Sequence, residues 1–165
     1  MLISESTETS MNSLIKYLFY GNAVVDNMYY NLNNKGFGNL AESIHDPVAH
    51  RFGVWADMFS DIMDKLGARP TRIGLPDAFE DLQVSQIYTD LQQYFLKLRA
   101  EVISVKDSAD LSGDCEIVKF LDDFLEETLL PYIRQAKEWK DALDVLGDKD
   151  FNIHVKEYTH YIPKA

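Results

Sequence analysis

Four side chains that can bind a metal ion recur at helical spacing in one stretch of the chain. They are His50, Asp57, Asp61 and Asp64, separated by seven, four and three residues. At roughly 100° per residue, these positions share one face of an α-helix. Carboxylates four residues apart point the same way and can hold one hard or borderline divalent cation. The pattern therefore fits half of a metal site that another subunit completes. It also fits an acidic face exposed to solvent, which is the more common case.

The helix that carries these side chains is expected from Asp46 to Leu66. Asp46 suits the N-cap, Pro47 suits the first helical position, and Gly67 follows the last apolar residue. The apolar residues alternate in steps of four and three, which predicts one buried stripe. The stripe consists of Val48, Phe52, Trp55, Phe59, Ile62 and Leu66. It lies about 160–200° from the acidic face, so one side of the helix can be buried while the other presents the metal-capable groups.

Three further long helices are predicted from the same spacing of apolar residues. We expect them over about Thr9–Asn33, Asp77–Lys106 and Cys115–Leu146. Pro131 removes one backbone donor inside the last of them and predicts a kink. Four long helices predict a single all-α domain, a four-helix bundle over residues 1–165. The connection 67–76 is long enough for a crossover along the bundle, but it also fits a tight hairpin.

The first helix has two features of its own. Gly21 lies on its apolar stripe, and because glycine costs about 1 kcal/mol against alanine in a helix, it predicts close packing there. A neighbouring strip is half polar and contains Asn22, Asp26 and Tyr29. This strip fits either a boundary between core and solvent or the wall of a subunit interface.

The two ends of the chain differ from the helical segments. Residues 1–8 are polar and are expected to fray. In the tail, residues 148–165, Phe151, Ile153 and Val155 alternate with polar residues. This alternation predicts a short extended segment that either lies on the bundle or grips a neighbouring subunit.

The composition of the chain limits the partners and the cellular compartment that we expect for this protein. The formal net charge of −11 disfavours nucleic acid as a partner and favours cations, including metal ions. The single cysteine, Cys115, excludes an intrachain disulfide and fits a reducing compartment. No apolar run approaches the length of a membrane span, and the first ten residues do not have the pattern of a signal peptide. We therefore expect a cytoplasmic protein.

Most catalytic motifs are absent from the sequence. It contains no P-loop, no G-x-G-x-x-G after a strand, no G-x-S-x-G and no H-E-x-x-H. The E-x-x-H pair of many di-iron bundles is missing from the last three predicted helices. The Asp57-x-x-x-Asp61 pair is the remaining candidate for chemistry.

In its first half, from Met28 to Pro70, the chain resembles the Dps family of small ferritins. That family has H-W-N at the end of the first helix, then G-x-x-F, a histidine, and D-x-x-x-E-R before L-G-G. The corresponding residues here are Tyr29-Tyr30-Asn31, Gly36-Phe37, Asp57-x-x-x-Asp61 and Leu66-Gly67-Ala68. The second half matches only in helix lengths and loosely around Lys137-Glu138-Trp139.

The resemblance implies a metal site with altered ligands. Asp57 and Asp61 fall on the family's two carboxylate ligands, with Asp61 in place of the usual glutamate. Tyr29 stands where the family has its first histidine, and Ala41 or Glu42 where it has the second. His50, or His45 from the preceding connection, could substitute from a shifted position. The predicted ligands are Asp57, Asp61, Glu42, Tyr29 and His50, and iron suits their mainly oxygen donors.

The resemblance also implies a function and an assembly. It implies a ferroxidase that oxidises Fe(II) and stores the product in a hollow dodecamer, in a role of stress protection, with each ligand set shared between two subunits. Some family members bind DNA through lysine-rich tails, but residues 1–10 contain two glutamates and no lysine, so DNA binding is not expected. The alternative is a bundle of the same fold that has lost metal chemistry and acts as an assembly or interaction protein.

Overall fold

The structure is a computed structural model that describes residues 1–74 and 82–165. Its described residues form helices and no strand. In chain order the elements are α1 (Glu5–Asn34), α2 (Gly38–Ile44), the π-helix η1 (His45–Ala49), α3 (Arg51–Lys65), the 3₁₀ helix η2 (Val84–Gln86), α4 (Ile87–Leu111), α5 (Cys115–Asp123), the π-helix η3 (Phe124–Leu129), α6 (Leu130–Leu146), α7 (Asp148–His154) and the 3₁₀ helix η4 (Val155–Tyr158).

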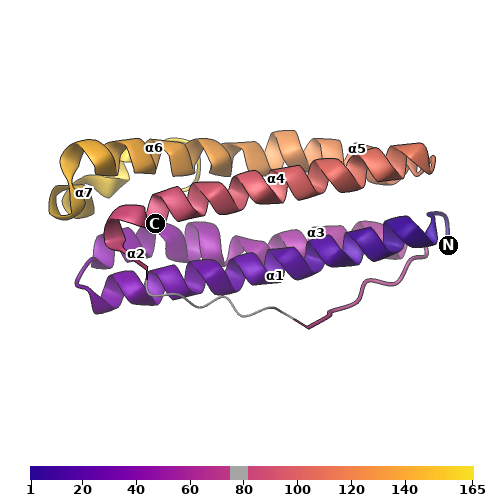
Figure 1. Ribbon diagram of the computed structural model, residues 1–165, viewed down its shortest axis with the longest axis horizontal. Coiled ribbons are helices and arrows are strands. Elements are labelled where there is room, and N and C mark those ends of the chain that lie inside the picture. The colour runs from indigo at the N-terminus through magenta and orange to yellow at the C-terminus, as the bar shows by residue number, and fades with distance from the viewer. Residues whose placement is uncertain (75–81) are drawn as a thin grey trace.

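Four long rods build the molecule, as predicted. They are α1, α3, α4 and the continuous run α5–η3–α6, and they lie side by side (Figure 1). The amide of Leu2 donates to the carbonyl of Leu66 at 2.8 Å, so α3 ends beside the start of α1. The ammonium of Lys35 donates to the carbonyl of Leu82 at 2.7 Å, so α4 begins beside the end of α1. Residues 66 and 82 thus lie at opposite ends of the bundle. The connection is a crossover, which leaves α3 and α4 parallel.

Aromatic side chains fill the interior between the rods. Trp55 is 1% exposed, and its ring centroid lies 5.0 Å from that of Tyr132 and 5.8 Å from that of Phe124. The Phe59 ring meets Phe124 edge-on at 4.9 Å. Edge-to-face pairs at these distances add to the stabilisation from burial alone. The predicted inward stripe of α3 is confirmed, with Ile62 as its one half-buried member.

Gly21 lets α1 approach α4, as its place on the apolar stripe predicts. The hydroxyl of Tyr94 passes over Gly21 and donates to the carbonyl of Tyr17 at 2.7 Å. A Cβ atom at Gly21 would overlap the Tyr94 phenol and would lie 2.7 Å from the Phe52 ring. The absence of a side chain is therefore required by packing.

The N-terminus differs from the expected frayed segment, because α1 begins at Glu5 instead of Thr9. Ser4 is the N-cap, and its hydroxyl accepts from the amide of Thr7 at 3.2 Å. The carboxylate of Asp114 accepts from both the amide and the hydroxyl of Ser4, at 3.3 Å and 3.0 Å. Ile3 and Thr7 are buried. A bond to a residue far away in sequence thus holds this end of the chain.

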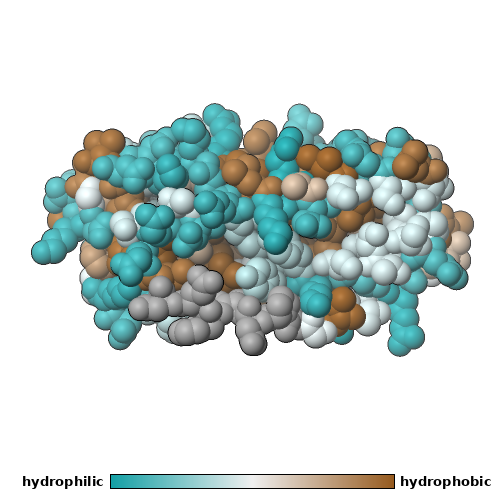
Figure 2. Space-filling view, in the orientation of Figure 1, coloured by the Kyte–Doolittle hydropathy of each residue, from teal (hydrophilic) through white to brown (hydrophobic). Residues whose placement is uncertain are grey.

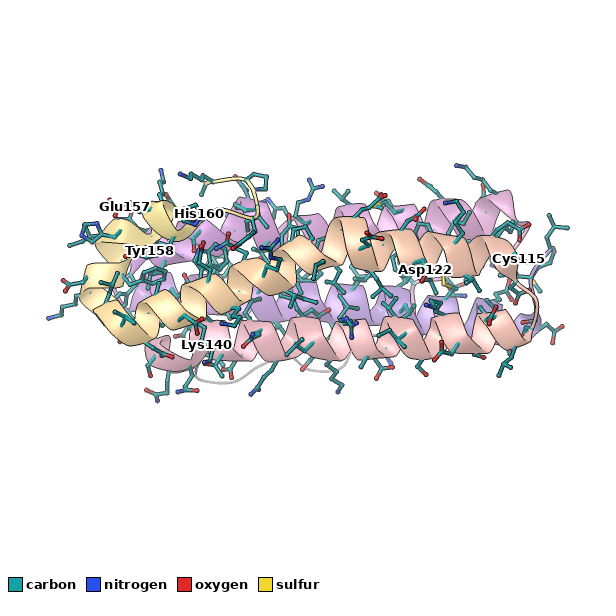
Figure 3. The ribbon with its side chains drawn as sticks, turned by 90° about the horizontal axis from the view of Figure 1, so that it is seen from above. Cys115, Asp122, Lys140, Glu157, Tyr158 and His160 are labelled. Atoms are coloured by element: carbon teal, nitrogen blue, oxygen red, sulfur yellow. The ribbon has the colours of Figure 1, made fainter. Side chains whose placement is uncertain are left out.

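The other three predicted helices also have different bounds in the structure. The expected helix from Asp46 to Leu66 is divided into η1 and α3, and Asp46 lies inside η1 instead of capping a helix. The third helix begins at Ile87 and ends at Leu111; its predicted start at Asp77 lies outside the described residues. The fourth contains the π-helix η3, directly before Pro131 in the first turn of α6. The chain changes direction between α5 and α6, where the kink was predicted (Figure 3).

Residues 148–158 of the tail form α7 and η4, so the predicted extended segment around Phe151, Ile153 and Val155 is wrong. Phe151 and Val155 are buried, whereas Ile153 is 68% exposed. Residues four apart share one face of a helix, and this spacing, not the alternation, decides the local structure. The tail lies along the same chain's α6 (Figure 3), where the indole of Trp139 donates to the hydroxyl of Thr159 at 3.1 Å.

The outer surface is mixed in polarity. On the face shown in Figure 2, hydrophilic side chains cover much of the bundle and apolar side chains form separate groups. Among the described helices, none combines the length and the apolar composition that a membrane span requires.

Candidate metal centre

A single chain does not gather the five predicted ligands into one cluster. Asp57 and Asp61 lie on the exposed face of α3, one turn apart. Glu42 is exposed on α2 and borders a shallow pocket beside the tail. Tyr29, on α1, is half-buried. Among the carboxylates and histidines of this set, only His50 joins a group of three such side chains whose ligand atoms lie close together. The joint role of the five residues stays a prediction.

The structure brings together His45, Asp46 and His50. Their potential ligand atoms all lie within 4.8 Å of one another, and no other such group of three occurs in residues 1–74 and 82–165. The Oδ1 atom of Asp46 lies 2.8 Å from Nδ1 of His50 and 3.7 Å from Nδ1 of His45. The two imidazole rings are 4.4 Å apart between centroids. All three side chains are at least partly exposed, so a cation in solution can reach them.

The π-helix creates this arrangement. The amide of His50 donates to the carbonyl of His45 at 3.2 Å, a bond from residue i+5 to residue i. In an α-helix, residues five apart would lie about 140° apart around the axis; the wider π turn places them one above the other. Pro47 has no amide hydrogen and cannot make the α-helical bond to the carbonyl of Ser43. This proline was the local signal in the sequence that the hydrogen-bond pattern changes here.

Two side chains of α1 contact the π turn and hold it in position. The ring of Tyr29 stacks on that of His45, with centroids 4.1 Å apart. The amide side chain of Asn22 donates to the carbonyl of Ala49, the last residue of η1, at 2.8 Å. Two members of the half-polar strip therefore position η1 within the same chain.

The interior of the bundle offers no comparable group. In di-iron bundles, glutamates and histidines from facing helices project inward. Here the buried polar residues among those described are Thr7, Ser43, Asp114, Gln135 and Thr159. The one carboxylate in this set, Asp114, is held by Ser4 at the end of the bundle. The described part of the interior therefore holds no cluster of glutamates and histidines of that kind.

One carboxylate on the acidic face of α3, that of Asp57, forms an ion pair with a side chain of the same chain. The guanidinium of Arg72 lies 3.7 Å from the carboxylate of Asp57 and donates to the hydroxyl of Ser60 at 2.9 Å. The same group lies 5.1 Å above the centroid of the Phe19 ring, within cation–π range. Because both charged side chains are well exposed, the ion pair itself is weak.

An all-α bundle with one long crossover is a ferritin-like fold, and comparison with solved structures agrees. The chain is similar in structure to an open pore ferritin from the hyperthermophilic archaeon Archaeoglobus fulgidus, with a TM-score of 0.81 over 95% of this chain and 96% of that chain. The two sequences are 14% identical, so the similarity establishes the fold alone. No protein-family model matches the sequence, and neither does any curated protein.

Proposed function

We propose that this protein is a Dps-like ferritin that oxidises Fe(II) and stores the product within an oligomeric shell. The observation that carries the proposal is the exposed pair Asp57 and Asp61, one turn apart on α3 of a ferritin-like bundle. Carboxylates suit iron, and a bundle interior filled with aromatic side chains leaves the surface as the place for it.

The proposed site is incomplete in one chain and requires a partner. Two carboxylates provide too few ligands for a stable iron site, so a second subunit would add Glu42, Tyr29 or His50 across a two-fold interface. Four Fe(II) ions would each give one electron to one dioxygen molecule, which would take up four protons and become two water molecules, and the Fe(III) product would pass into the shell. A dodecamer in the cytoplasm, without DNA bound, is the assembly that the family resemblance favours.

The alternative is an assembly or interaction protein of the same fold without ferroxidase chemistry. Arg72 favours it, because its guanidinium already lies beside Asp57, where a metal ion would have to approach. The histidine ligands of the Dps pattern are also replaced in this chain. The two proposals differ in their response to Fe(II) and agree in their requirement for self-association.

The deciding experiment measures iron oxidation and assembly together. Purified protein receives Fe(II) in air, Fe(III) is followed by absorbance, and co-elution of iron with protein is followed by gel filtration. We expect rapid oxidation by the parent and loss of it in the double variant Asp57→Asn/Asp61→Asn, with the oligomer unchanged. Oxidation at the buffer rate by the parent, with the oligomer intact, would establish the alternative. A monomer at micromolar concentration would remove the basis for both proposals.

A further inference from the structure

We infer that His45, Asp46 and His50 form a binding site for a borderline divalent transition-metal ion, with Zn²⁺ as the representative case. The site lies within one chain and does not depend on the proposed ferroxidase function. It uses two imidazoles and one carboxylate of the same chain, whereas the proposed iron site rests on Asp57 and Asp61, with His50 among the candidates for the ligand that a second subunit adds. The inference stands on geometry, on donor chemistry and on the way in which the surrounding residues hold the ligands.

The geometry is close to that of a bound metal ion. Zinc bonds of about 2.0–2.1 Å in a tetrahedral site separate ligand atoms by about 3.3 Å. The distances from Asp46 Oδ1 to the two histidine nitrogens, 2.8 Å and 3.7 Å, lie on either side of that value. The three ligand atoms lie within 4.8 Å of one another, so side-chain rotations that shorten the longest separation would bring all three donors to one ion. Three protein ligands leave at least one coordination position open, which water or a ligand from a second copy can fill.

The donor set selects the class of cation. Imidazole suits Zn²⁺, Cu²⁺, Ni²⁺, Co²⁺ and Fe²⁺, whereas Mg²⁺ and Ca²⁺ prefer sites made of oxygen ligands. Two of the three donors here are imidazole nitrogens. We therefore expect Zn²⁺ and Co²⁺ to bind and Mg²⁺ and Ca²⁺ to compete poorly, even at large excess.

The surroundings hold two of the ligands in place before the metal arrives. The backbone bond from the amide of His50 to the carbonyl of His45 fixes their spacing. The Tyr29 ring covers one face of the His45 imidazole and restricts its rotation. Single π turns inside helical segments occur often at functional sites. Preorganised ligands lose less conformational entropy on binding, which favours affinity.

A competing explanation is a simple ion pair between Asp46 and a protonated histidine. Among the described residues, two such pairs lack a second histidine: His154 with Glu157 at 3.2 Å and His160 with Glu138 at 2.6 Å. They serve as matched controls, because each offers one imidazole and one carboxylate on the surface. If ion pairing were the only role of His45, Asp46 and His50, Zn²⁺ would bind this cluster no more tightly than it binds the two control pairs.

The test is calorimetric titration of the full-length protein with Zn²⁺, supported by visible absorption spectra with Co²⁺. We expect saturable binding of one ion per chain in the parent. Affinity should fall more than about tenfold in His45→Ala, Asp46→Asn and His50→Ala, and should be unchanged in His154→Ala. The absorption bands of protein-bound Co²⁺ should disappear with His50→Ala. Circular dichroism and thermal unfolding verify that each variant is folded.

Two outcomes would overturn the inference. One is the absence of saturable Zn²⁺ binding by the folded parent. The other is equal binding by the parent and by folded His50→Ala, which would place the ion elsewhere. The double variant Asp57→Asn/Asp61→Asn separates this site from the proposed function, because it should lose Fe(II) oxidation and keep its Zn²⁺ stoichiometry. Failure of iron oxidation with intact Zn²⁺ binding would contradict the proposed function alone.

Discussion

The imidazole of His45 stacks on the phenol ring of Tyr29, with ring centroids 4.1 Å apart and ring planes 16° from parallel. This contact joins the C-terminal part of α1 to the π turn that carries the candidate metal ligands. It gives Tyr29 a role through its ring, whereas a metal-ligand role would act through its oxygen. The two roles can be separated by substitution.

Tyr29→Phe keeps the ring and removes the oxygen, whereas Tyr29→Ala removes both. We expect Tyr29→Phe to bind Zn²⁺ within about twofold of the parent, because the stack on His45 persists. Tyr29→Ala should weaken binding by about 10–100-fold, as loss of residues that orient metal ligands does. The measurement is calorimetric titration. A large loss of Zn²⁺ affinity in Tyr29→Phe would show that the oxygen itself is required at this site.

Gly21 and Gly53 offer a pair of glycine-to-alanine changes with opposite expected signs. A Cβ at Gly21 would overlap the Tyr94 phenol, so Gly21→Ala should destabilise the protein by about 1–3 kcal/mol, as overpacking does. Gly53 is an exposed position of α3 with nothing within 4 Å of a Cβ atom, so Gly53→Ala should stabilise by about 0.5–1 kcal/mol through helix propensity. Urea unfolding measures both. Equal effects of the two changes would contradict the close approach of α1 and α4.

Local periodicity was enough to predict the long helices and the inward face of α3. Trp55 and Phe59 are buried as predicted because their spacing follows directly from the turn of an α-helix. The length of the connection between α3 and α4 did not decide between a crossover and a tight hairpin. Its crossover became clear only from the positions of Leu66 and Leu82 at opposite ends of α1.

Features that depend on distant contacts or on rare backbone geometry could not be predicted from the spacing of apolar residues. The cap at Ser4 depends on Asp114, which is 110 residues away. The approach of His45 and His50 depends on a π turn, whereas an α-helical wheel places them on different faces. Pro47 was the available clue, but a proline near a helix start is ordinarily interpreted as a first-turn residue.

Two buried tyrosines predict a loss of stability at alkaline pH. Burial raises the pKa of Tyr88 and of Tyr94 above the ordinary value of 10.0, because the phenolate would be poorly solvated. A raised pKa in the folded state means that folding favours the neutral phenol. Its contribution is present in full below the unfolded-state pKa near 10 and is lost as pH rises through the higher folded-state pKa. The free energy of unfolding should therefore fall as pH rises above about 10.

Tyr88→Phe provides the control for this prediction. Ser43 donates its hydroxyl hydrogen to the carbonyl of Leu40 at 2.6 Å, so Tyr88 is the donor in its 3.1 Å bond with Ser43. At neutral pH the variant should lose about 1 kcal/mol with this bond. At alkaline pH its stability should decline less steeply than that of the parent, since one titrating group is gone. Identical slopes in urea unfolding at each pH would show that Tyr88 does not contribute.

The last prediction concerns Gln135, which is fully buried on α6 and holds the C-terminal tail with both ends of its amide. Its nitrogen donates to the carbonyl of Tyr158 at 2.8 Å, and its oxygen accepts from the amides of His160 and Tyr161 at 3.0 Å and 2.9 Å. Gln135→Leu has a similar volume but leaves these backbone groups without their partner, at a cost of about 1–3 kcal/mol.

We expect the tail of Gln135→Leu to detach from α6 while the four long helices stay folded. Trypsin should then cleave after Lys156 markedly faster than in the parent, and mass spectrometry would identify the released peptide. The control is Lys119→Leu, which removes an exposed polar side chain of α5 and its surface pair with Asp123, an interaction worth little. The same cleavage rate in Gln135→Leu and Lys119→Leu would mean that burial of Phe151 and Val155 alone retains the tail.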